Sequence, residues 1–100
     1  MNRSRSYRDL VVWRKSIDLV KAIYSYTRSF PKEEIYGIVS QMRRAGVSIP
    51  ANIAEGQARN GKKEFLQFLG IAQGSLAELE TLLTISESLG YLPKSNYKEL

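Results

Sequence analysis

Three cations of this chain are spaced for a single helical face. Arg14, Lys21 and Arg28 are seven residues apart, which is close to two turns of an α-helix, so their side chains lie on nearly one face. Such a row could contact the phosphates of a nucleic acid. Asp18 interrupts it, and a solvated face with an Arg14–Asp18 pair is the other interpretation. On this segment alone, the pattern favours the solvated face.

Other basic residues extend the candidate phosphate contacts. The net charge of +5 is uneven, because residues 1–28 sum to +5, residues 29–63 to +3 and residues 64–100 to −3. This distribution indicates a surface for a polyanion, or attraction between helices of opposite charge. No motif that reads bases is present, so binding would have little sequence preference. The candidate nucleic-acid contacts are Arg14, Lys21, Arg28, Arg43, Arg44, Arg59, Lys62 and Lys63, with Arg3, Arg5 and Arg8 as further candidates.

The side chains of common catalytic sites are missing or unsuitably spaced. The chain has no histidine and no cysteine, which removes the commonest general base, the commonest metal ligand and thiol chemistry. Glu78 and Glu80 are two residues apart, so on a helix they diverge by roughly 160° and cannot act as a carboxylate pair. Ser48 and Ser75 have no base that the sequence identifies, and residues 60–64 lack P-loop spacing. The sequence therefore predicts no enzyme, no cofactor and no metal.

Length and composition indicate one globular domain over residues 1–100. Hydrophobic residues make up 43% of the chain and charged residues 25%, which are ordinary values for a folded domain. The basic start is followed by no apolar signal core. No apolar run approaches the ~20 residues that a membrane span requires. We therefore expect a cytoplasmic protein without membrane association.

The spacing of apolar residues predicts an all-α chain. Helices are expected over about residues 10–28, 32–59 and 63–89, with the start of a fourth at Asn96. Asp9 is the expected N-cap of the first, and Gly90 ends the third. Pro50 predicts a kink in the second, or two helices with Ser48 capping the later one. The predicted core consists of Leu10, Trp13, Ile17, Val20, Tyr24, Ile35, Ile38, Met42, Ala45, Ile49, Ile53, Phe65, Phe68, Leu69, Ala72, Leu76, Leu79 and Leu83.

Two of these helices lack the charged solvent face of an ordinary surface helix. Residues 45–54 and 65–77 carry no charge, and small residues recur opposite the apolar stripe of the third helix. Glycine inside a helix costs about 1 kcal/mol relative to alanine, so Gly70 and Gly74 indicate close approach of another backbone. Self-association explains both observations. The predicted oligomer interface comprises Ser48, Ala51, Asn52, Ala54, Glu55, Gly70, Gly74, Ala77 and Thr81.

Four segments carry a family resemblance: YRDLVVW (7–13), FPKEEIYGI (30–38), RRAGVSIPANIAEG (43–56) and FLGIAQGSLAELET (68–81). They resemble the bacterial four-helix-bundle proteins encoded in intervening sequences of large-subunit ribosomal RNA genes. That family is similar to the accessory variability proteins of diversity-generating retroelements. The resemblance implies an up-and-down antiparallel four-helix bundle, with the fourth helix truncated here, that assembles as a ring-like homopentamer. For the retroelement branch it also implies binding of nucleic acid and of a reverse transcriptase.

Two functions are consistent with these observations. The predicted function is a non-catalytic homo-oligomeric bundle that binds RNA or DNA through its basic surface. The alternative is a protein-interaction scaffold, which would dock a reverse transcriptase or another partner without binding nucleic acid itself. Steep salt dependence of binding would favour the first function.

Overall fold

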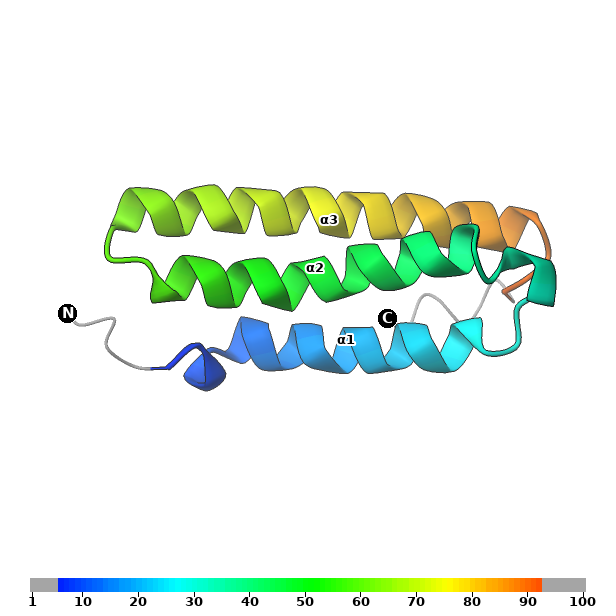
Figure 1. Ribbon diagram of the computed structural model, residues 1–100, viewed down its shortest axis with the longest axis horizontal. Helices are drawn as coiled ribbons and strands as arrows, with labels where there is room; N and C mark the ends of the chain where they lie inside the picture. Colours follow the sequence, from blue (N-terminus) through cyan, green and yellow to red (C-terminus); the bar gives the residue numbers. More distant parts are fainter. Residues whose placement is uncertain (1–5, 93–100) are drawn as a thin grey trace.

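The computed structural model describes residues 6–92, and this part of the chain contains three α-helices and no strand. The helices are α1 (Val11–Thr27), α2 (Ile38–Ala58) and α3 (Lys62–Ser88), with 3₁₀-helices at Tyr7–Asp9 and Lys32–Glu34. Figure 1 shows each helix antiparallel to the next, with α2 between α1 and α3. The predicted all-α class is confirmed, while the predicted helix start at Asn96 lies outside the described residues.

The structure differs from the prediction for the first helix in where the helix starts and in which residues it buries. Asp9 does not cap it, because Asp9 belongs to the preceding 3₁₀-helix and α1 begins after the extended residue Leu10. Tyr24, a predicted core residue, is 39% exposed, whereas Ser16 and Thr27 are buried. Their hydroxyls donate to carbonyls of their own helix at 2.7 Å, which lowers the cost of burial. An apolar stripe alone could not reveal this.

The second predicted helix begins later than expected. Residues 32–37 form a 3₁₀-helix and a turn, and α2 begins at Ile38 because Gly37 has non-helical dihedral angles (φ −112°, ψ −115°). The Glu34 carboxylate accepts a hydrogen bond from the Ile38 amide at 3.3 Å and so caps the new helix. Ile35 was predicted to be in the core, but it precedes α2 and is 52% exposed.

Helix α2 continues through Pro50, which is buried, so the alternative of two separate helices is wrong. The ring of Pro50 removes one backbone donor from the helix interior. The remaining predicted core positions of α2 are buried: Ile38, Met42, Ala45, Ile49 and Ile53. The core therefore runs along α2, the helix that lies between the other two.

Helices α2 and α3 approach closely at Gly56. A Cβ atom on Gly56 would lie 2.8 Å from the Cβ of Phe68 and 3.3 Å from the carbonyl oxygen of Phe65. Both atoms belong to or adjoin the backbone of α3, so neither can move without shifting that helix. Glycine at this position therefore allows the two helices to meet just before and after their short connection.

Substitution of Gly56 by alanine tests this contact. We expect Gly56→Ala to lower the free energy of unfolding by about 1–3 kcal/mol through overpacking, although alanine favours a helix. The matched control is Gly46→Ala in the same helix, because a Cβ there would meet only the Val20 side chain, at 4.0 Å. This substitution should raise stability by up to about 1 kcal/mol. Chemical denaturation measures both, and equal stability of Gly56→Ala and the unsubstituted chain would contradict the close contact.

The third helix buries three of its seven predicted core residues and ends as expected. Ala72, Leu79 and Leu83 are buried, but Leu76 is 39% exposed and is not part of the core. Gly90 has φ +81°, and the amides of Gly90 and Tyr91 donate to carbonyls of the last turn at 3.0 and 2.9 Å. This arrangement is a Schellman motif, which requires the left-handed conformation that glycine adopts readily.

The end of α3 anchors the connection between α1 and α2. The Tyr91 hydroxyl donates a hydrogen bond to the Glu34 carboxylate at 2.8 Å, and the Tyr91 ring lies 5.4 Å from that of Phe30. The hydrogen bond, the burial of the hydroxyl and the negative charge of Glu34 raise the pKa of Tyr91. The Glu34 carboxylate also accepts a hydrogen bond from the Ile38 amide at the start of α2. Residues 34–38 are therefore fixed by contacts to both α3 and α2.

Candidate nucleic-acid interface

Basic residues of α1 and α2 meet on one side of the molecule. Lys21 and Arg28 lie three residues before and four residues after Tyr24, so all three are neighbours on the surface of α1. The guanidinium carbon of Arg43 lies 4.5 Å from the centroid of the Tyr24 ring and joins this surface to α2. The basic face, as we define it, consists of Arg14, Lys21, Arg28, Arg43 and Arg44.

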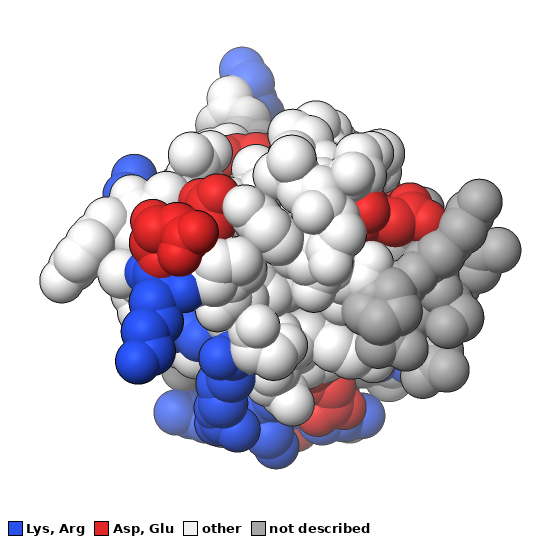
Figure 2. All heavy atoms as spheres, turned by 90° about the vertical axis from the view of Figure 1, so that its right-hand side faces the viewer, with Lys and Arg blue, Asp and Glu red and all other residues white. Residues whose placement is uncertain are grey.

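Figure 2 shows the molecule from the end at which α1 connects to α2. Blue side chains gather mainly on the lower side, where α1 lies, and the upper part over α3 is largely white with some red. This agrees with the sequence, because α3 carries four glutamates and its only cations, Lys62 and Lys63, lie in its first turn. The positive potential is therefore directed away from α3.

Among residues 6–92, no cation of the basic face forms an ion pair with a carboxylate. Within residues 6–92, the only ion pair is formed by Arg59 and Glu55, at 2.7 Å, and the Arg14–Asp18 pair considered above does not form. Arg14 instead donates a hydrogen bond to the Arg8 carbonyl at 3.2 Å. Arg43 donates through Nε to the Thr27 hydroxyl at 3.0 Å while its guanidinium covers Tyr24. Arg43 is thus held in one orientation before any ligand arrives.

A hollow of about 450 Å³ lies beside the basic face, between α1, α2 and their connection. It contains two tyrosines and two arginines, and its other walls are aliphatic or small. Tyr36 is the most exposed large side chain around it, at 95%. We call this hollow the tyrosine groove, and its lining residues are Tyr24, Ile35, Tyr36, Val39, Ser40, Arg43, Arg44 and Val47.

The other predicted phosphate contacts lie elsewhere. Arg59, Lys62 and Lys63 surround the connection between α2 and α3, at the opposite end of the bundle from the α1–α2 connection (Figure 1). Arg59 follows Arg43 by sixteen positions along and just past α2, which corresponds to about 24 Å along the helix axis. Arg59 is also engaged, because it pairs with Glu55 and lies over the Phe68 ring at 5.0 Å. The structure therefore divides the predicted site into two groups.

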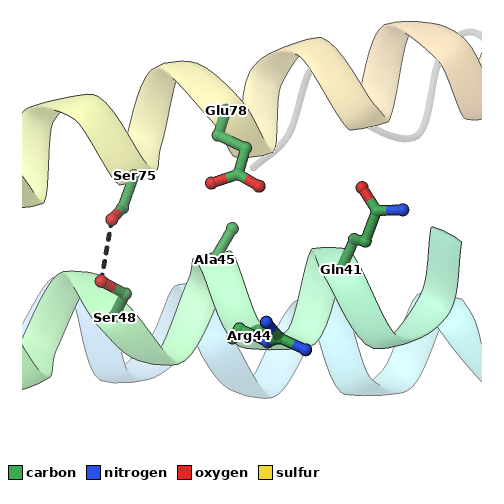
Figure 3. Close-up of a pocket in the computed structure, with 6 residues that line it drawn as sticks. All are labelled: Gln41, Arg44, Ala45, Ser48, Ser75 and Glu78. Carbon is green, nitrogen blue, oxygen red and sulfur yellow. Dashed lines mark hydrogen bonds between the residues drawn. The ribbon is translucent and has the colours of Figure 1, made fainter. Parts of the chain in front are cut away.

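A second, polar cavity of about 190 Å³ opens between α2 and α3. Figure 3 shows Ser48 and Ser75 joined across the two helices and the Glu78 carboxylate directed towards α2 above Ala45. The two hydroxyls are 2.8 Å apart, and the Asn52 amide donates to Ser48 at 2.9 Å. These groups satisfy one another, so they hold the helices together and provide no activated nucleophile.

The predicted oligomer interface falls on two different surfaces. The Ser48 hydroxyl pairs with Ser75 of α3 within the same chain, Asn52 donates to Ser48, and Glu55 pairs with Arg59. Gly70, Gly74, Ala77 and Thr81 instead lie on the exposed face of α3, where a Cβ at either glycine would meet nothing within 4 Å. We call this second surface the small-residue face; it consists of Gly70, Gly74, Ala77, Thr81, Thr84 and Ser88.

In the part of the chain that the structure describes, no three or more Asp, Glu, His or Cys side chains lie together as metal ligands would. Among the same residues, no helix has both the length and the apolar character that crossing a membrane requires.

Sequence reasoning selected the cations of this candidate interface as possible phosphate contacts but did not place its tyrosines on the surface. Tyr24 was assigned to the core because it continues an apolar stripe, and Tyr36 was placed inside a helix that begins only at Ile38. Gly37 was the available signal, since a glycine beside Pro31 and two glutamates favours a break in the helix. A break there places Tyr36 on a connection, where its ring can face solvent.

A comparison with known protein families supports the resemblance carried by the four sequence segments. The family model described as 23S rRNA-intervening sequence protein matches residues 8–100. A search of curated proteins found no significant match.

Proposed function

The chain belongs to the 23S rRNA-intervening sequence protein family, and we propose that it is a non-catalytic protein that binds nucleic acid through its basic face. The observation that carries this proposal is the cluster of cations on adjoining surfaces of α1 and α2, none of which forms an ion pair within residues 6–92. Unpaired cations displace the counterions of a polyanion when they contact its phosphates, and this release favours binding.

We expect the ligand to be RNA, bound with little sequence preference. The described helices carry no base-reading motif, so contacts to the backbone should dominate and sequence preference should be weak. The family name refers to an intervening sequence of 23S rRNA, which makes RNA the first polyanion to test. Single-stranded DNA carries the same charge per nucleotide and is the natural comparison.

We further propose that the chain self-associates, as a four-helix bundle in a ring-like homopentamer. The small-residue face supports this, because it is exposed and flanked by Leu66, which is also exposed. A ring would repeat the basic face on every subunit, and each additional phosphate contact raises the total affinity. The oligomer thereby compensates for the modest charge of one chain.

A second function is supported by the same uncovered surface of α3. Leu66, Ile71 and Ile85 are exposed on this helix, and Leu89 is exposed directly after it. Exposed apolar residues commonly mark sites of protein interaction. The chain would then be a scaffold that docks a protein such as a reverse transcriptase. Capture of a partner that persists after nuclease treatment, together with absence of direct nucleic-acid binding, would favour this function.

Salt dependence of binding tests the proposed function. We expect the purified chain to bind a short single-stranded RNA, with log K falling linearly with log salt and a slope of about −0.7 for each phosphate contacted. Fluorescence anisotropy over a series of salt concentrations gives the slope, and single-stranded DNA of equal length provides the comparison. If neither strand binds even at low salt, the proposed function is wrong.

A further inference from the structure

We propose that the tyrosine groove binds an unstacked base of single-stranded nucleic acid, with Tyr36 as the stacking surface and Arg43 and Arg44 beside the adjoining phosphates. This inference rests on the proposed function and names the form of nucleic acid that the basic face receives. Tyr36 is 95% exposed, so its side chain contributes little to folding.

The segment that carries Tyr36 is held in place. Its neighbour Glu34 accepts hydrogen bonds from the Tyr91 hydroxyl at 2.8 Å and from the Ile38 amide at 3.3 Å. These contacts fix both sides of the connection, while Ile35 and Tyr36 remain on its outer surface. An exposed ring on a fixed segment can stack on a ligand without a large cost of ordering.

The groove combines the two features that a nucleotide requires. Its walls include Tyr36, Ile35 and Val47, which suit the flat apolar surface of a base, and Arg43 and Arg44 lie at the same hollow. None of its lining residues is a carboxylate, so its charge complements phosphate. Aromatic rings next to cations are the usual elements of sites for single-stranded nucleic acid.

The two tyrosines have different roles. One surface of the Tyr24 ring is covered by Arg43, whose guanidinium lies 4.5 Å from the ring centroid, so Tyr24 positions that arginine. Tyr36 has no such partner among the ring and cation contacts of residues 6–92, and its ring remains available. Because the bases of a duplex already stack on both sides, only an unstacked base can use it.

Tyr36→Ala is the decisive variant, because loss of an exposed ring should leave the melting temperature unchanged. Binding would be measured with a single-stranded oligodeoxythymidylate, with an abasic strand of equal length that retains the phosphates, and with a duplex. We expect Tyr36→Ala to weaken binding of the oligodeoxythymidylate about tenfold, as loss of one stacking contact predicts. Binding of the abasic strand and of the duplex should be unchanged, and Tyr36→Trp should restore binding of the single strand.

Val12→Ala is the matched control, because Val12 is exposed on α1 and lies outside the groove. It should alter none of the three affinities. If Tyr36→Ala binds all three probes like the unsubstituted chain, the stacking site is wrong while charge-driven binding stands. If no probe binds at low salt, the proposed function itself fails. If Tyr36→Ala instead abolishes capture of a protein in the absence of nucleic acid, the groove docks a protein segment and the inference is overturned.

Discussion

Replacement of Lys21, Arg28 and Arg44 by glutamine is expected to weaken binding of single-stranded nucleic acid about 100-fold near 0.1 M salt. Each cation that neutralises a phosphate contributes about 0.7 to the slope of log K against log salt, so three lost contacts reduce the slope by roughly 2. These residues are exposed, and none forms an ion pair within residues 6–92. Their loss should therefore change binding while leaving the fold intact.

The measurement is a pair of salt titrations, monitored by anisotropy, with the melting temperature as a check on folding. The triple variant should show both the lower affinity and the shallower slope. An unchanged slope would mean that the polyanion contacts other residues. In that case the group around the α2–α3 connection, with Lys62 and Lys63 in the first turn of α3, becomes the site to test next.

Substitutions on the small-residue face are expected to have a large effect on the oligomeric state. We expect Gly70→Leu combined with Gly74→Leu to convert the proposed oligomer to single chains and to preserve helix content. Within one chain the new side chains project into open space, since a Cβ at either glycine meets nothing within 4 Å. Leucine also has a higher helix propensity than glycine. Close packing against a second chain would not tolerate either leucine.

Light scattering coupled to size exclusion measures the mass, and circular dichroism measures the helix content. Lys15→Leu is the control, because it adds an exposed leucine on α1, away from α3. Retention of the oligomer by the double variant would exclude this face as the interface. A single-chain mass for the unsubstituted protein would contradict self-association itself.

The sequence predicted the helical architecture because apolar periodicity records which side of a helix is buried. The core of α2 was correctly predicted at Met42, Ile49 and Ile53, where the stripe is strong and both neighbours are helices. The end of α3 was predicted at Gly90 because only the left-handed conformation completes the motif there. Such local signals need no knowledge of the partner helices.

The remaining features depend on contacts that are distant in sequence. Thr27 can be buried because its hydroxyl donates to a carbonyl of its own helix and accepts a hydrogen bond from Arg43. The polarity of threonine alone would instead predict an exposed side chain. The beginning of α2 depends on Glu34, whose orientation is fixed by Tyr91 from the far end of α3. For this reason the tyrosine groove could not be predicted, although its two arginines could.

The most direct test of the proposed interface compares two single substitutions on the same helix. Lys21→Gln removes a cation from the basic face, and Lys15→Gln removes one from an exposed position on another side of α1. Both variants have the same net charge, so a nonspecific effect of total charge would weaken binding of single-stranded RNA equally. We expect Lys21→Gln to weaken binding about fivefold near 0.1 M salt, with little effect of Lys15→Gln. Equal affinities for the two variants would contradict a nucleic-acid interface on the basic face.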